Sequence, residues 1–127
     1  MNTEVTFKSD LFKPFLPDES QVNPNCYGAE LAYWLSQMLA KSGIITSYPE
    51  YEDWGWFIEY VTPSDDEFWL CCRNIDGLEN KWCVSLEAKG KGLFGRKKPE
   101  LKIAQALITT LETILEKSDP VHEVSWS

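Results

Sequence analysis

A chain of 127 residues with 43% hydrophobic and 13% aromatic side chains is expected to fold as one domain, since disordered chains contain few aromatic residues. Its net charge of −8 argues against nucleic-acid binding, because phosphate contacts need clustered Lys and Arg. No stretch is apolar for long enough to span a bilayer. The first ten residues lack an apolar export signal, so we predict a cytoplasmic protein whose four cysteines stay reduced.

The N-terminal third predicts a strand, an irregular arm and a helix. Residues 3–8 are rich in β-branched side chains and suit a short strand. Residues 9–24 contain three prolines and predict an arm, pinned to the body by Leu11, Phe12, Phe15 and Leu16. Residues 25–42 have the spacing of an amphipathic helix, whose buried face would consist of Leu31, Trp34, Leu35, Met38 and Leu39.

The middle of the chain predicts four strands, over 44–48, 54–61, 67–73 and 81–87. Short turns separate these strands, which favours an antiparallel meander. In 81–87, alternation predicts that Trp82, Val84 and Leu86 point inward. In 54–61, it predicts one face with Trp54, Trp56, Ile58 and Tyr60, and a reverse face with Gly55, Phe57, Glu59 and Val61.

The C-terminal third predicts a basic loop over 88–97, a helix over 99–117 and a strand over 121–126. The buried stripe of the helix would consist of Ala104, Leu107, Ile108, Leu111, Ile114 and Leu115. The predicted fold class is therefore α+β, in the order β-α-β-β-β-β-α-β, with two amphipathic helices packed on an antiparallel sheet of about five to six strands. We expect 1–127 to be a single domain, with 1–24 as a partly irregular N-terminal arm.

The segment around Tyr51 to Trp56 is unusual, because it combines tryptophans with acids. Residues 50–67 hold seven acids and no base. An exposed Trp54–Trp56 pair beside acidic side chains would have the composition of a protein-binding hot spot. The alternative is a tryptophan pair in the core, with the acids at a solvated strand entrance. The predicted partner-binding residues are Glu50, Glu52, Asp53, Trp54 and Trp56.

Six of the twelve basic side chains lie in residues 89–102, which carry a charge of +5 against −13 for the rest of the chain. Gly90 to Gly95 matches the G-x-G-x-x-G pattern of dinucleotide-binding loops. That fingerprint needs a parallel β-α-β unit, whereas here it follows an antiparallel meander, so we predict no cofactor. We interpret the segment as a mobile loop or, alternatively, as an anion- or partner-binding loop with Lys89, Lys91, Arg96, Lys97 and Lys98.

No recognisable catalytic set occurs in the sequence. His122 is the single histidine and the cysteines form no C-x-x-C pair, so we predict no metal site. A Cys–His nucleophile would also need a third, orienting group. We predict that the chain is not an enzyme. The alternative is a small-molecule enzyme with a Trp-lined cleft that uses Glu59, Cys72 or His122.

In size, acidity and α+β architecture the chain resembles bacterial immunity proteins, which block a toxin by binding it. In the same features it is similar to secretion chaperones of the type III class, which are commonly dimeric. The first resemblance implies an inhibitor of a basic toxin or enzyme, and the second an acidic homodimer that holds an extended client. We therefore predict a non-enzymatic protein-binding module, monomeric or homodimeric, with a basic protein as partner.

Overall fold

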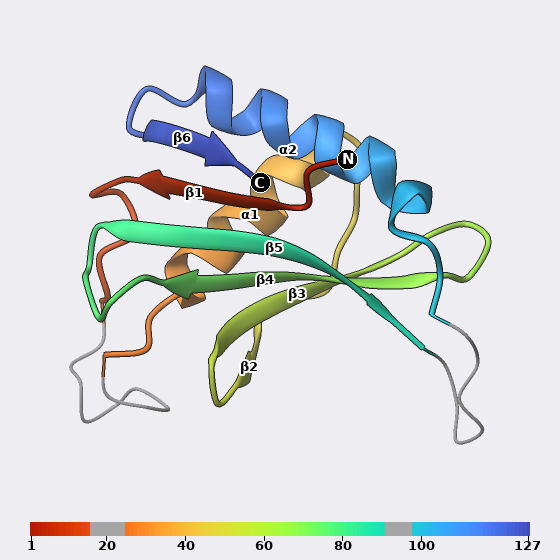
Figure 1. The fold of residues 1–127 in the computed structure, drawn as a ribbon, viewed down its shortest axis with the longest axis horizontal. Coiled ribbons are helices and arrows are strands. Elements are labelled where there is room, and N and C mark those ends of the chain that lie inside the picture. The colour runs from red at the N-terminus through yellow and green to blue at the C-terminus, as the bar shows by residue number, and fades with distance from the viewer. Residues whose placement is uncertain (16–24, 91–97) are drawn as a thin grey trace.

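The computed structural model describes residues 1–15, 25–90 and 98–127 and contains one six-stranded sheet with two α-helices (Figure 1). The predicted α+β class and element order are confirmed. The helices are α1 (Ala29–Lys41) and α2 (Gln105–Lys117), and a short 3-10 helix, η2 (Leu101–Ala104), precedes α2. The strands are β1 (Glu4–Lys8), β2 (Glu50–Glu52), β3 (Gly55–Val61), β4 (Glu67–Asn74), β5 (Lys81–Lys89) and β6 (His122–Trp126).

The sheet has the order β2-β3-β4-β5-β1-β6, and each pair of neighbours is antiparallel. Strands β2 to β5 follow the chain as the predicted meander. The N-terminal strand β1 then lies between β5 and the C-terminal strand β6, so the two ends of the chain pair side by side: Val5 is opposite Val84 on one side and Trp126 on the other.

Both helices pack on the same face of the sheet, and α1 crosses behind the strands in Figure 1. The predicted stripes are confirmed: Leu31, Leu35 and Leu39 of α1 are fully buried, and Trp34 and Met38 pack at the edge of the core. All six predicted positions of the second helix are buried as well. The sheet contributes inward side chains that alternate along each strand, as period two requires; they include Ile58, Leu70, Trp82, Val84 and Leu86.

The N-terminal arm is attached to the core through Phe12. This side chain is 1% exposed, and its ring centroid lies 5.0 Å from that of Trp34 and 6.0 Å from that of Trp82. The indole Nε1 of Trp82 donates a hydrogen bond of 3.0 Å to the Ser9 carbonyl, which satisfies a buried donor. The prediction was wrong for Leu11 and Phe15, which are exposed, and Leu16 lies outside the described residues.

The strand predicted over 44–48 is wrong, and β2 lies at Glu50–Glu52 instead. Ser47 shows the physical reason. Its backbone N–H donates to the Glu59 carbonyl at 2.9 Å, but the N–H of Glu59 donates to the Ser47 hydroxyl, also at 2.9 Å. A side-chain oxygen thus accepts the bond that a regular ladder would give to a backbone carbonyl.

Candidate functional site

The two tryptophans of the β2–β3 hairpin lie on opposite faces of the sheet. Trp54 is in the turn, is 38% exposed, and has its ring centroid 6.4 Å from that of Phe57. Trp56 is in β3, is half-buried against the core, and has its ring centroid 5.7 Å from that of Tyr51. The prediction of one shared face is wrong, because the strand begins at Gly55 and a turn residue need not follow its alternation.

The strand register identifies the side chains on the face of the sheet opposite the helices, which is termed the outer face. Phe57 is opposite Cys71, and Cys71 is opposite Ser85, so these side chains share one face. Phe57 and Cys71 are 3% and 2% exposed, yet neither belongs to the core shared with the helices. Other side chains on the outer face must therefore shield them from water.

Three rings and one cation lie in contact on this face; they are termed the aromatic row and consist of Trp54, Phe57, Trp69 and Lys89. The rings of Phe57 and Trp69 are stacked, with centroids 3.7 Å apart and an interplanar angle of 12°. Trp54 also contacts Phe57, with its ring tilted by 39° to that of Phe57. The ammonium of Lys89 lies 4.0 Å from the centroid of the Trp69 ring, which is a cation–π contact. The row thus has a cation at one end and an exposed indole at the other.

Carboxylates surround the aromatic row. Glu59 lies in the middle of them, and burial raises its pKa, as do the nearby charges of Glu67 and Glu50, in that order. The neighbouring Trp69 lowers the pKa of Glu59 by a smaller amount. The buried Nε1 of Trp69 has no hydrogen-bond partner among the described residues. Like charges are therefore crowded on this face. The strand register puts six acids on this face: Glu4, Glu50, Glu52, Glu59, Glu67 and Glu87.

The predicted site residues are only partly brought together. Glu50, Glu52 and Asp53 are exposed in the same hairpin as Trp54. Of the predicted basic loop, Lys89 ends β5 and contacts Trp69, and Lys98 is exposed. The others, Lys91, Arg96 and Lys97, lie outside the described residues. Sequence reasoning missed Trp69 as a site residue, since its stacking on Phe57 depends on the register of two strands.

The four cysteines are free thiols, and three of them, Cys71, Cys72 and Cys83, are buried. Burial raises the pKa of Cys71 to about 12 and that of Cys83 to about 11. Burial also raises the pKa of Cys72, which is fully buried and faces the helices. These three groups are protonated at neutral pH and are therefore weak nucleophiles. Cys72 is 0% exposed and presents no surface to a substrate in this structure.

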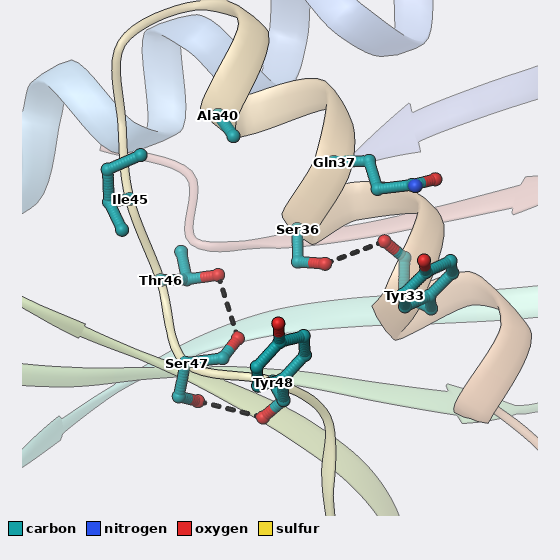
Figure 2. A pocket seen from close by; sticks show the side chains of 8 residues that line it. All are labelled: Tyr33, Ser36, Gln37, Ala40, Ile45, Thr46, Ser47 and Tyr48. Atoms are coloured by element: carbon teal, nitrogen blue, oxygen red, sulfur yellow. Dashed lines mark hydrogen bonds between the residues drawn. The ribbon is translucent and has the colours of Figure 1, made fainter.

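A hollow of about 320 Å³ separates α1 from the segment 44–48 (Figure 2). Its serine and threonine hydroxyls donate to backbone carbonyls: Ser36 to Tyr33 at 2.7 Å, Thr46 to Ser47 at 3.0 Å, and Ser47 to Tyr48 at 2.9 Å. The lining contains no carboxylate, cysteine, histidine or tryptophan. It consists of Tyr33, Ser36, Gln37, Ala40, Ile45, Thr46, Ser47 and Tyr48. General acid–base chemistry has no carboxyl or imidazole group to use there.

Comparison with known proteins gives no assignment: no protein-family model, curated protein or solved structure matches this chain. Within 1–15, 25–90 and 98–127, no group of three or more His, Cys, Asp or Glu side chains is arranged to hold a metal ion. In the same residues, no helix has the length and apolar character needed to cross a membrane.

Proposed function

We propose that this chain is a non-enzymatic protein-binding module whose contact surface centres on the β2–β3 hairpin and the adjoining aromatic row. The observation that carries the proposal is an exposed tryptophan, Trp54, on a sheet face that neither helix covers. Tryptophan is among the residues most enriched at the energetic centres of protein interfaces. Contact with Phe57 restrains this ring before binding, which reduces the entropy lost on association.

The charge around Trp54 favours a basic partner. Glu50, Glu52 and Asp53 are exposed within the same hairpin, and no base occurs in residues 50–67. A field of one sign speeds the encounter with a protein of opposite sign and disfavours acidic competitors. A cytoplasmic inhibitor of a basic toxin or enzyme, of the immunity-protein kind, is the role within this proposal that combines these features.

The proposal is tested by charge reversal with a matched control. Immobilised wild type, the hairpin variant Glu50→Lys/Glu52→Lys and the control variant Glu116→Lys/Asp119→Lys are compared for the proteins they capture from bacterial lysates. The control changes the net charge equally but lies on and just after α2. A protein captured by wild type and control is then purified for measurement of its association rate.

We expect the hairpin variant to associate at least about tenfold more slowly at low salt, whereas the control matches wild type within about twofold. If both variants slow equally, only net charge matters and the hairpin is not the interface. If no captured protein distinguishes wild type from the hairpin variant, the proposed function is wrong. Light scattering of the purified chain separately tests the chaperone-like homodimer.

A further inference from the structure

The aromatic row has two ends that differ in one respect. At the Trp69 end, the ring face is occupied by the ammonium of Lys89, 4.0 Å from the centroid. At the Trp54 end, the described residues place no cation on the indole, which is 38% exposed. The chain's own structure thus shows that this row accepts a cation on a tryptophan face, and that a second tryptophan face is open.

The open end of the row also has unneutralised negative charge around it. Glu52 is opposite Gly55, the residue after Trp54, and Glu50 is opposite Phe57 on the same face. Neither carboxylate forms an ion pair within the described residues, where the ion pairs join Lys8 to Glu123, Arg73 to Glu4 and Lys102 to Glu100. A cation on Trp54 would be attracted by the ring and by both carboxylates together.

We propose that an arginine side chain of the protein partner stacks on the exposed face of Trp54, with Glu50 and Glu52 as its counter-charges. This inference rests on the proposed function and names the chemistry that its surface recognises. A guanidinium is planar and weakly hydrated, so it stacks on an indole and donates in its own plane to carboxylates at the ring edge. A lysine ammonium satisfies one of these contacts at a time and binds less tightly.

The test uses a short peptide of alternating arginine and serine, titrated into the ¹⁵N-labelled protein while the six indole N–H signals are followed by NMR. The same peptide with citrulline in place of arginine is the neutral control of equal shape. Trp82 is an internal reference, because it is fully buried and its Nε1 is bonded to the Ser9 carbonyl. We expect the Trp54 signal to shift with the arginine peptide and the Trp82 signal to stay in place.

Two variants of one hairpin separate the stacking site from a general loss of aromatic surface. Trp54→Leu removes the proposed platform and should weaken the arginine peptide about fivefold or more. Tyr51→Leu removes a more exposed ring, 61% against 38%, from the helix side of the same hairpin, and should leave affinity unchanged. An unaltered Trp82 signal in both variants shows that the core is intact. A third peptide, with lysine in place of arginine, should bind about threefold more weakly than the arginine peptide.

The outcomes distinguish this inference from the proposed function. Equal binding of the arginine and citrulline peptides, a shift at Trp69 in place of Trp54, or equal loss in both variants overturns the arginine site. If a captured partner still depends on Glu50 and Glu52 in that case, protein binding by the hairpin stands without it. If the partner is also indifferent to the hairpin charges, both proposals fail. A self-associated chain that dissociates in Trp54→Leu would make a second copy the occupant and would likewise overturn the choice of an arginine-bearing partner.

Discussion

Gly28 allows the start of α1 to approach the sheet, and substituting it should have a large and specific cost. Its φ is +150°, and a Cβ at this position would lie 2.6 Å from the carbonyl oxygen of Cys72 in β4. The obstacle is backbone, so a side-chain rotation cannot relieve it. Gly43, after the end of α1, is a natural control, because its φ is also positive, at +88°, but nothing lies within 4 Å of its missing Cβ.

The two glycines separate backbone strain from steric exclusion. Alanine in a left-handed conformation costs about 1 kcal/mol, which is what we expect for Gly43→Ala. Gly28→Ala adds the clash, for which an overpacked site loses about 1–3 kcal/mol more, so we expect a total loss of about 2–4 kcal/mol. That is a large share of the roughly 5–15 kcal/mol by which a domain is stable.

Urea unfolding, followed by circular dichroism at equal protein concentration, measures both variants. At a slope of about 2 kcal/mol per M, Gly43→Ala should lower the midpoint by about 0.5 M and Gly28→Ala by about 1–2 M. Equal midpoints would refute the reasoning, since they would mean that α1 shifts away from Cys72 without loss. A native state of Gly28→Ala with altered Trp56 emission would show such a shift directly, because Trp56 Cδ1 lies 3.4 Å from the same Cβ position.

Three further predictions concern the acid cluster, the thiols and the tryptophans. The raised pKa of Glu59 means that its contribution to stability is fully present below the unfolded-state pKa and is lost as the pH rises through the folded-state pKa. Glu59→Gln should therefore raise the urea midpoint at pH 7 but not at pH 4. An equal gain at both pH values would contradict the raised pKa. Thiol titration of the native protein should label Cys26 first, since the other three cysteines are buried. Cys71, at a pKa of about 12, should react only on the timescale of unfolding. Simultaneous labelling of all four cysteines would be inconsistent with the fold. In Trp54→Phe, acrylamide quenching should lose its most accessible component, and stability should change little. Trp82→Phe should cost about 2–4 kcal/mol of unfolding free energy through a cavity and an unpaired Ser9 carbonyl. A larger loss of stability in Trp54→Phe than in Trp82→Phe would contradict the assignment of Trp82 to the core.

Both helices and most of the strands could be predicted from the sequence. The stripe of Leu31, Leu35 and Leu39 repeats at helical spacing, and Trp82 and Val84 alternate as a strand with one buried face requires. These patterns are local, because they depend on which side of a single element meets the core. Where a side chain replaces a backbone partner, as Ser47 does for Glu59, the local pattern no longer identifies the strand, and the prediction over 44–48 failed.

The candidate site divides in the same way. Its composition, acids beside Trp54, is visible in the sequence, and so is the assignment of Phe57 to the reverse face of its strand. What tertiary structure decided is the register that stacks Phe57 on Trp69 and places Lys89 over that ring. These contacts join residues of three strands, and a shift of one residue in any pairing would send each side chain to the other face. The sequence alone indicates both helices, most of the strands and the apolar side of each, whereas the pairing of distant strands determines which side chains meet.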